Sequence, residues 1–401
     1  VVIFLAWAPI ILPIIDNGTN NKHNSAYNED WNGWANYRTA LEGEGYDVMS
    51  IQSSISTINS LPDDKHIILV TAGPNTFYNP ASEIPFFLTA FKKNFSMFIC
   101  EDHGTAENLL FQTFIASQAK TPITFIPDGI LRDNSSYWKT PAFPVITDFT
   151  ASPVAQGIDS VVLSYASGFL GGEILSGLGW NIIGSTSGDY SFIDVNKDGQ
   201  YDQSEDVYKI PSSITNLLQD QQGALGLTGE LLELGFPLGG YSQAVFSNKE
   251  VNERSRVFCA TDASFLNNEL TSVVQYDNLQ FGINIIDWLS FQDGGAYSPA
   301  KEDTIVVFDE KHLRVESGWT DISSAGSFGI VQGYVNWLST NPILGLVYPL
   351  FALNTLRKWI PKEGDKQEVQ LRDLEEAERN RALLKFRTSS FFAQKINWNR
   401  K

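Results

Sequence analysis

Short, continuous apolar runs alternate along this chain with longer stretches of helical periodicity. Residues 66–71 and 97–100 are such runs, which are typical of strands buried on both faces. Between them, residues 84–95 have the spacing of an amphipathic helix. This order predicts a mainly parallel, doubly wound α/β sheet with helices on both faces. Further strands are predicted at 46–51, 182–187, 244–246, 257–260 and 304–309, further helices at 34–45, from 104, from 267 and at 279–289, and short strands with loops over 119–175.

Two apolar segments carry almost no charge and predict membrane anchors. Residues 1–15 are shorter than the about 20 residues that a spanning helix needs, so we interpret them as an incomplete N-terminal anchor. A buried strand is the alternative, although two prolines suit a strand poorly. Residues 328–360 are predicted to form a C-terminal transmembrane segment, with an amphipathic helix on the protein surface as the alternative. A soluble protein that buries both segments is the remaining alternative.

The charge distribution predicts which side of a membrane each part occupies. The chain of 401 residues has a net charge of −18, which disfavours nucleic acid as a partner. Residues 1–356 hold 16 Lys and Arg against 39 Asp and Glu, whereas residues 357–401 hold 12 against 7. Because basic segments beside a membrane span stay in the cytoplasm, the helical tail 361–401 is predicted to be cytoplasmic. An α/β domain over 16–300 and a membrane-proximal segment over 301–327 are then extracytoplasmic, in a protein of the cell membrane.

The segment 194–205 has the most specific chemical pattern in the chain. Oxygen-bearing side chains at loop positions 1, 3, 5, 9 and 12, with glycine at position 6, match the spacing of a calcium-binding loop. Position 7 contributes its backbone carbonyl, and Gly199 permits the sharp turn. The alternative is a hydrated turn without an ion. The predicted calcium ligands are Asp194, Asn196, Asp198, Gln200, Asp202 and Glu205.

The surroundings of this loop indicate a structural ion rather than a sensor. A sensor loop needs a helix on each side, and the sequences before and after residues 194–205 do not predict helices. Weak calcium sites of this kind are useful where calcium is abundant, which agrees with an extracytoplasmic domain. Glycosylation sequons begin at Asn17, Asn94 and Asn134 and predict a glycoprotein.

Several polar residues follow predicted strands, where ligand sites of parallel sheets are usually found. These residues could line one crevice and bind a metal ion or another ligand. The alternative, which we favour, is that Asp102 and Asp262 cap the helices that follow them. The residues in question are Asp102, His103, Asp262, Glu310 and His312.

The two cysteines, Cys100 and Cys259, each end an apolar run. Buried small side chains are the favoured interpretation, and a disulfide between neighbouring strand ends is the alternative. An enzyme with a nucleophilic cysteine needs a tight turn with glycines around it, whereas Ile99 and Glu101 flank Cys100. The adjacent Glu101 is also expected to raise the pKa of the thiol.

A series of short motifs occurs in a characteristic order along residues 25–356. The motifs are 27–33 (YNEDWNG), 72–74 (AGP), 100–106 (CEDHGTA), 191–194 (SFID), 261–268 (TDASFLNN), 277–289 (DN to WL) and 308–312 (FDEKH). In this order the chain resembles an uncharacterised, mostly archaeal family of membrane-anchored proteins. Its ectodomain is similar to the class I glutamine amidotransferase-like fold and to the auxiliary domain of gliding-motility-type ABC transporters.

The resemblance implies membrane anchors at both ends and no established activity. Such proteins often occur beside AAA-type ATPases and von Willebrand-like domain proteins, which implies a role in assembly or secretion. The tail 361–401 lies outside the resemblance.

Together these observations favour a non-catalytic, membrane-anchored surface protein stabilised by structural calcium. It is expected to act as a scaffold or partner-binding subunit of a membrane assembly, with other membrane or surface proteins as partners. The alternative function is a cell-surface hydrolase or amidotransferase-like enzyme that uses the strand-end crevice near Cys100, Asp102 and His103.

Overall fold

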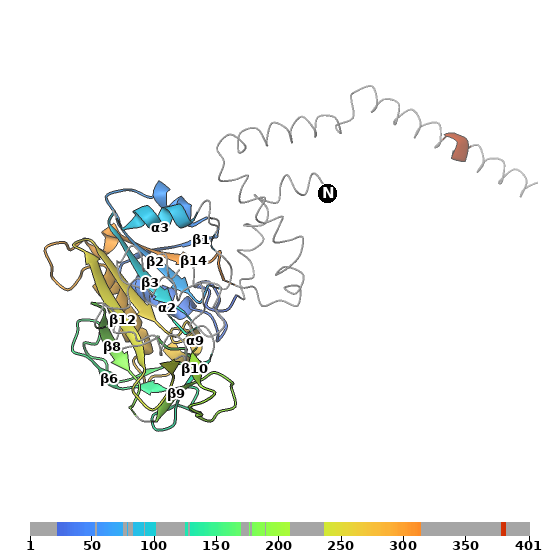
Figure 1. The fold of residues 1–401 in the computed structure, drawn as a ribbon. Helices are drawn as coiled ribbons and strands as arrows, with labels where there is room; N and C mark the ends of the chain where they lie inside the picture. The colour runs from blue at the N-terminus through green and yellow to red at the C-terminus, as the bar shows by residue number, and fades with distance from the viewer. Residues whose placement is uncertain are drawn as a thin grey trace, which may run out of the picture. The chain divides into compact units, whose positions relative to one another are not determined.

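An eight-stranded mixed sheet forms the centre of the structure, a computed structural model, in the order β1-β14-β2-β3-β13-β12-β8-β6 (Figure 1). The structure describes residues 22–313, apart from 53, 75–77, 79–82, 92, 102–124, 127–128, 170–175, 177–178, 189 and 209–235, and also residues 378–381. The strands of this sheet are β1 (Asp47–Ile51), β2 (His66–Ala72), β3 (Phe95–Cys100), β6 (Asp148–Phe149), β8 (Asn181–Ser185), β12 (Ala244–Asn252), β13 (Ser255–Ala260) and β14 (Thr304–Asp309).

Five neighbouring strands, from β1 through β14, β2 and β3 to β13, are all parallel. Every residue of β2, β3, β13 and β14 is buried, which explains why these strands are nearly continuous apolar runs in the sequence. The prediction of a mixed α/β fold with a mainly parallel sheet is therefore confirmed. The predicted domain boundary at residue 300 falls before β14, and β14 belongs to this sheet.

The remaining three strands of the sheet run antiparallel to their neighbours. β12 pairs with β13 as a hairpin, and β8 and β6 complete this side of the sheet. β12 is longer than the predicted 244–246 because its polar second half continues to pair with β13. Its residues change from fully buried at Ala244 to partly exposed and exposed from Lys249 onward.

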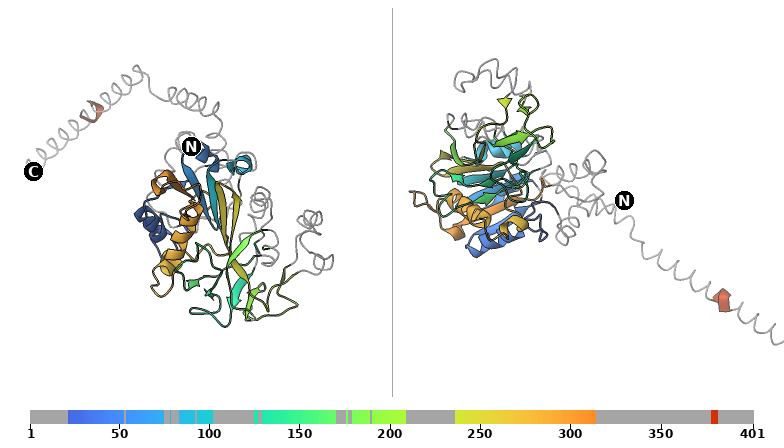
Figure 2. Two further views of the ribbon diagram at one scale, coloured as in Figure 1. Left: turned by 90° about the vertical axis from the view of Figure 1, so that its left-hand side faces the viewer. Right: turned by 90° about the horizontal axis from the view of Figure 1, so that it is seen from below.

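Helices cover both faces of the sheet. α2 (Ala35–Gly43), α9 (Asn268–Thr271) and α10 (Asn278–Leu289) cover one face, where α2 and α10 lie side by side (Figure 2). α3 (Ile84–Ala90) covers the other face and ends five residues earlier than predicted because Phe95 begins β3. A 3₁₀ helix, η1 (Ile55–Ser60), joins β1 to β2, and another, η3 (Lys301–Asp303), precedes β14.

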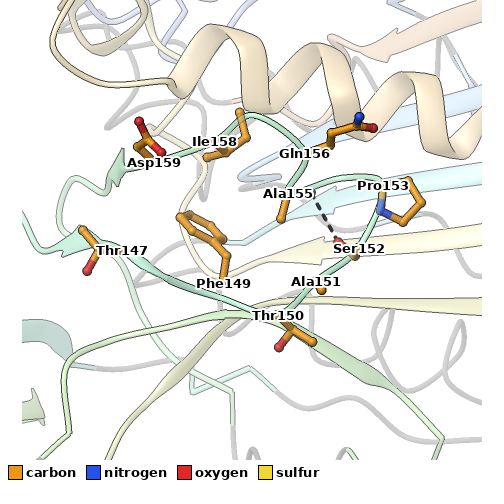
Figure 3. A pocket seen from close by; sticks show the side chains of 10 residues that line it. All are labelled: Thr147, Phe149, Thr150, Ala151, Ser152, Pro153, Ala155, Gln156, Ile158 and Asp159. Atoms are coloured by element: carbon orange, nitrogen blue, oxygen red, sulfur yellow. Dashed lines mark hydrogen bonds between the residues drawn. The ribbon is translucent and has the colours of Figure 1, made fainter.

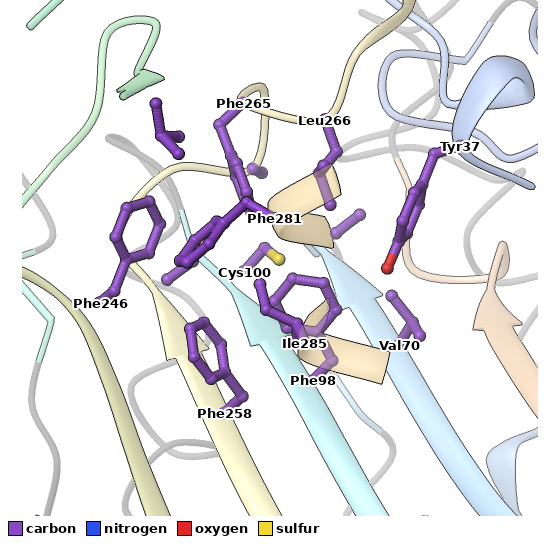
Figure 4. Packing of buried hydrophobic residues seen from close by; sticks show 14 of the residues in the cluster. Tyr37, Val70, Phe98, Cys100, Phe246, Phe258, Phe265, Leu266, Phe281 and Ile285 are labelled. Carbon is purple, nitrogen blue, oxygen red and sulfur yellow. The ribbon is translucent and has the colours of Figure 1, made fainter. Parts of the chain in front are cut away.

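Alternate residues of the central strands build two separate hydrophobic layers. Val70, Phe98 and Phe258 pack beneath α10, whereas the adjacent Leu69 and Met97 pack on the face covered by α3. The α10 layer is rich in aromatic rings, and Figure 4 shows them around the same strands. This two-layered burial fixes the strand register, because a shift by one residue would exchange the two faces.

Among the described residues, three short two-stranded sheets accompany the large one. β4 (Ile130–Asp133) pairs with β9 (Ser191–Asp194), β5 (Val145–Ile146) with β7 (Val161–Val162), and β10 (Val207–Tyr208) with β11 (Phe236–Pro237), all antiparallel. The short strands within 119–175 agree with the prediction for that region, whereas β9 was not predicted. The calcium-type loop lies between β9 and β10.

Several predicted features fall outside the described residues. They are the anchor 1–15, the segment 328–360, the helix from 104 and most of the tail. Residues 378–381 are helical, as predicted for that part of the tail. Among the residues that the structure does describe, no helix is both long enough and apolar enough to cross a membrane.

Candidate functional site

The loop 194–205 is held between two strands rather than two helices. β9 ends at Asp194, the first predicted ligand, and β10 begins at Val207. Asp194 is completely buried, whereas the other predicted ligands are exposed. Lys197 and Gly199 have φ angles of 63° and 84°, so the backbone turns sharply here, as the glycine at position 6 predicts. In the described residues, the elements that adjoin this loop on both sides are strands.

Side-chain oxygens of the loop accept hydrogen bonds from its own backbone. Asn196 Oδ1 accepts from Asp198 N at 3.0 Å, and Asp198 Oδ1 accepts from Gln200 N at 2.8 Å. Asp202 Oδ1 likewise accepts from Ser204 N at 2.7 Å. These short-range bonds fold the loop tightly and bring successive oxygen-bearing residues onto one compact turn.

Two carboxylates of the loop region have strong partners. Asp194 Oδ2 accepts from Gly199 N at 2.9 Å and from Arg132 Nε at 2.5 Å. Glu205 Oε2 accepts from Asn196 Nδ2 at 2.6 Å, which joins loop positions 3 and 12 directly. The first and last thirds of the loop are therefore already in contact.

Sequence reasoning missed two residues that hold this loop, Asp206 and Arg132. Asp206 is completely buried and accepts hydrogen bonds from Val195 N and Asp202 N, both at 2.9 Å, so it closes the base of the loop. Asp206 directly follows the twelfth residue of the predicted loop, so its position in the sequence could have identified it as a loop residue. Arg132 lies on β4, and its separation from Asp194 in the sequence gave no signal.

The donor set of the loop suits calcium, which prefers carboxylate, amide and carbonyl oxygens. Four carboxylates and one amide oxygen lie on a loop whose ends already meet. Among the described residues, however, no group of three or more His, Cys, Asp and Glu side chains is gathered closely enough to hold a metal ion. Asp194 instead pairs with Arg132, and Glu205 pairs with Asn196. The calcium site therefore stays a prediction.

Of the residues predicted at the strand ends, the structure describes Asp262, Glu310 and His312, and all three are buried. Asp102 and His103 lie outside the described residues. Asp262 is buried, and its carboxylate accepts from Ser164 N at 2.6 Å and Ser264 N at 2.5 Å, so it holds loop backbone. The N-cap of the following helix, α9, is Asn267, so the interpretation of Asp262 as the cap of that helix is wrong.

Glu310 attaches the segment 22–33 to the carboxyl ends of the strands. Its Oε1 atom accepts from Ala26 N at 2.7 Å, and its carbonyl accepts from Lys22 Nζ at 3.2 Å. Asn24 reaches the carbonyl of Ala72, the last residue of β2, at 3.5 Å. The segment 22–33 therefore covers the carboxyl ends of β2 and β14.

Further contacts anchor the same covering segment. Trp34 Nε1 donates to the carbonyl of Ala263 at 3.1 Å, and Asn268 Nδ2 donates to the carbonyls of Asn28 and Asp30 at 2.9 and 2.6 Å. These groups are mostly buried, so their hydrogen bonds replace contacts with water.

His312 belongs to a buried ionic cluster beyond the end of β14. Its Nδ1 atom lies 2.7 Å from Asp309 Oδ2, and its Nε2 atom lies 3.4 Å from Glu83 Oε2. Lys311 Nζ contacts the other Glu83 oxygen at 2.6 Å, and the Tyr78 ring stacks on the imidazole at 3.8 Å between centroids. Sequence reasoning missed Glu83 and Tyr78, which lie far from His312 in the sequence.

The charges of this cluster stabilise one another. Burial opposes ionisation of His312, but the Asp309 and Glu83 carboxylates outweigh it and raise the pKa of the imidazole. Burial would raise the pKa of Glu83, but His312 and Lys311 outweigh it and lower that pKa to about 2. These contacts favour the protonated imidazole, which suits a structural role better than that of a general base.

Cys100 lies in the apolar layer and not at an open site. Figure 4 shows its sulfur among aromatic and aliphatic side chains, including Phe98, Phe281 and Ile285. Burial, with Asp262, Cys259 and Glu101 nearby, raises the pKa of this thiol well above its ordinary value. Such a thiol remains protonated and is a poor nucleophile.

Cys259 also has a free, buried thiol, as the favoured interpretation predicts. Cys259 lies opposite Ile99 in the register, and Cys100 lies opposite Ala260. Because the two cysteines are offset by one residue, their side chains enter different hydrophobic layers. The alternative of a disulfide between them is therefore wrong for this structure.

A pocket of about 560 Å³ lies along the segment 147–159, next to the edge strand β6 (Figure 3). Phe149 and Ile158 form its apolar part, and Thr150, Gln156 and Asp159 contribute polar groups. Ser152 Oγ accepts from Ala155 N at 3.3 Å and shapes the turn. None of the residues predicted from sequence to form a site lines this pocket.

The sequons differ in accessibility. Asn134 is exposed in the turn after β4, whereas Asn94 is half-buried and the Ser96 of its sequon is buried in β3. Asn17 lies outside the described residues.

The chain matches no protein-family model and no curated protein sequence. Among solved structures it is similar to the "mmIFT52 N-terminal domain", with 10% sequence identity and a TM-score of 0.41. The similar region covers 64% of this chain and 89% of that one. Similarity at this level is too low to assign a fold family or a function to the chain.

Proposed function

We propose that this protein is a non-catalytic, membrane-anchored surface protein that binds other membrane or surface proteins in an assembly. The segments 1–15 and 328–360 would anchor it, with the α/β domain outside the cell and the tail 361–401 in the cytoplasm. We further propose that the sheet is a doubly wound sheet of the glutamine amidotransferase-like type, as in the membrane-anchored family that the sequence resembles.

One observation carries the non-catalytic part of this proposal. The carboxyl ends of parallel strands are where enzymes with such sheets usually bind substrates. Here Glu310, Asn24 and Ala26 close part of that edge, and a buried ionic cluster fills the region beyond β14. A domain that fills part of its usual ligand edge with its own side chains is better suited to present its outer surface to partners.

Purification from native membranes tests the anchoring and the partner-binding role together. The full chain is expected to need mild detergent for extraction, to resist release by high salt, and to co-purify with defined membrane or surface proteins. Release by high salt alone would refute the anchors, and recovery of the chain without stoichiometric partners would refute the role in an assembly.

Calcium binding to the loop 194–205 is the second part of the proposal. The preformed turn, the five oxygen-bearing side chains and the buried Asp194 support it. Calcium held there would join β9 to β10 and stabilise the folded state by mass action, with no role in chemistry.

Thermal unfolding of the full chain with calcium and with EDTA tests this site. Wild type is expected to melt at a higher temperature with calcium, and the double variant Asp194→Ala, Glu205→Ala is expected to lose that difference. The matched control is Glu29→Ala, Glu253→Ala, which removes the same charge from exposed positions elsewhere. A double variant in the loop that keeps the full calcium response would rule out this site.

A glycan on Asn134 is the third part of the proposal, because its sequon is exposed beside β4. Mass spectrometry of the natively purified chain is expected to find a modified peptide that contains Asn134. If the peptide that contains Asn134 is found only in its unmodified form, this part of the proposal is contradicted.

A further inference from the structure

Arg132 is a residue outside the loop that contacts the first predicted calcium ligand. In the β4–β9 pair, Arg132 lies opposite Phe192, and Asp194 lies opposite Ile130. Arg132 and Asp194 are therefore diagonal neighbours on one face, within reach of a long side chain. The Nε atom of Arg132 donates to Asp194 Oδ2 at 2.5 Å, with the arginine side chain 18% exposed and the aspartate side chain fully buried.

This ion pair balances a carboxylate that organises the loop. Asp194 Oδ2 also accepts from Gly199 N at 2.9 Å, and Oδ1 accepts from Asp198 N at 3.1 Å. A buried carboxylate without a counter-ion is unfavourable, so these turn-forming bonds depend on a nearby positive charge. Arg132 supplies that charge from within the protein.

We propose that Arg132 is a built-in counter-cation of the loop, which keeps the loop closed without calcium and weakens calcium binding. This inference rests on the proposed calcium role of residues 194–205. A calcium ion on Asp194 would share one carboxylate with the guanidinium, and two cations at this distance repel in a poorly solvated site. Since the net charge of the ligands tunes affinity in oxygen-based loops, Arg132 restricts filling to high calcium concentrations.

The surrounding geometry agrees with a permanent role for this side chain. The Arg132 guanidinium carbon lies beside Gly199, 3.9 Å from where a side chain on that glycine would begin. The guanidinium thus lies over the glycine turn as well as beside Asp194. Asp206 and the Asn196–Glu205 contact hold the other parts of the loop without a metal ion.

Calorimetric titration of calcium into the full chain in mild detergent tests the proposal. Arg132→Gln keeps a hydrogen-bond donor and removes the charge, so it is expected to bind calcium at least about tenfold more tightly than wild type. Arg132→Lys keeps the charge and is the matched control, with an affinity within about threefold of wild type. In EDTA, Arg132→Gln is expected to melt at a lower temperature than wild type because Asp194 loses its counter-ion.

The outcomes separate this inference from the calcium proposal. If wild type binds calcium and Arg132→Gln binds no more tightly, the inference is overturned while the calcium site stands. If only Arg132→Gln binds measurably, the inference is supported. If neither protein binds calcium, the calcium proposal fails and the inference fails with it.

If the Arg132→Gln variant is unfolded in EDTA, the proposal can still be tested by refolding. Calcium is then added back while circular dichroism follows the native signal. Recovery at calcium concentrations below the wild-type Kd supports the proposal, and the absence of recovery at saturating calcium overturns it.

Discussion

His66 should make the folded state less stable as the pH falls below neutral. The side chain is buried at the start of β2, where Nε2 lies 3.0 Å from the carbonyl of Leu289 and 3.1 Å from Ser96 Oγ. Nδ1 lies 3.2 Å from the Tyr297 hydroxyl. Burial lowers the pKa of His66 from 6.5 to about 4, and the positive charge of Arg256 adds to this, against the opposing hydrogen bond to Leu289.

The direction and size of the effect follow from linkage. A histidine whose pKa is lowered in the folded state binds fewer protons than in the unfolded state between pH 6.5 and about 4. The contribution of the neutral His66 side chain to stability is therefore complete above its pKa in the unfolded state. That contribution is lost as the pH falls toward its pKa in the folded state. Between about pH 7 and about pH 5 the loss attributable to His66 is about 2 kcal/mol.

The assay is urea unfolding of wild type and His66→Gln at about pH 7 and about pH 5. Glutamine keeps a donor and an acceptor but does not titrate, so the variant should lose about 2 kcal/mol less than wild type over this interval. His312 lies beyond the opposite end of the sheet strands. Its contribution to the pH dependence of stability is therefore the same in wild type and His66→Gln and cancels when the two are compared.

The control is His23→Gln, which replaces a histidine in the same way but leaves His66 and its hydrogen bonds intact. Equal pH dependence in wild type and His66→Gln would show that the buried ring is not held neutral, and would refute the reasoning.

Three further predictions concern packing and buried charge. Gly282→Ala should lower the free energy of unfolding by about 1–3 kcal/mol, measured in urea, because a Cβ there would approach neighbouring side-chain carbons to 2.6 and 2.7 Å. Glu83→Gln should destabilise the protein by about 3 kcal/mol at neutral pH. Because the pKa of Glu83 falls from 4.5 to about 2 on folding, this deficit should disappear as the pH falls through that interval, and a deficit that persists at low pH would contradict the ion pair with Lys311. Cys100 and Cys259 should react with a thiol reagent only after unfolding, and rapid labelling of the native protein would disprove their burial.

The sequence predicted the strands of the sheet best where both faces are buried. The stretches 67–70, 97–100, 257–260 and 305–308 are apolar without interruption because each strand is buried on both faces. The start of α9 was also predictable, since Asn267 accepts a hydrogen bond from Leu270 N as its N-cap.

Other elements had no equivalent local signal. β9 has only four residues between a glycine-containing turn and the calcium-type loop, so its apolar pair Phe192 and Ile193 was too short to indicate a strand. The second half of β12 contains Lys249 and Glu250 and resembles a loop, although its pairing with β13 continues. Here tertiary pairing overrides local composition.

The loop ligands could be predicted because their spacing within twelve residues defines the chemistry. Their partners could not be, because Arg132 precedes Asp194 by 62 residues and Glu83 precedes Lys311 by 228. A single sequence contains no record of which distant side chains meet, and these contacts decide whether a carboxylate is available to a ligand or already neutralised.

The place of β14 in the sheet has a consequence for biogenesis. β14 lies between β1 and β2, so Asp47 pairs with Ile305 and His66 pairs with Thr304, across almost the whole length of the domain. During synthesis, the facing edges of β1 and β2 stay open until residues 304–309 emerge. Open apolar edges recruit other strands, and pairing over such separations is slow. A nascent chain of this protein therefore needs protection until its last strand inserts, and truncation before residue 304 should convert a folding domain into an aggregating one.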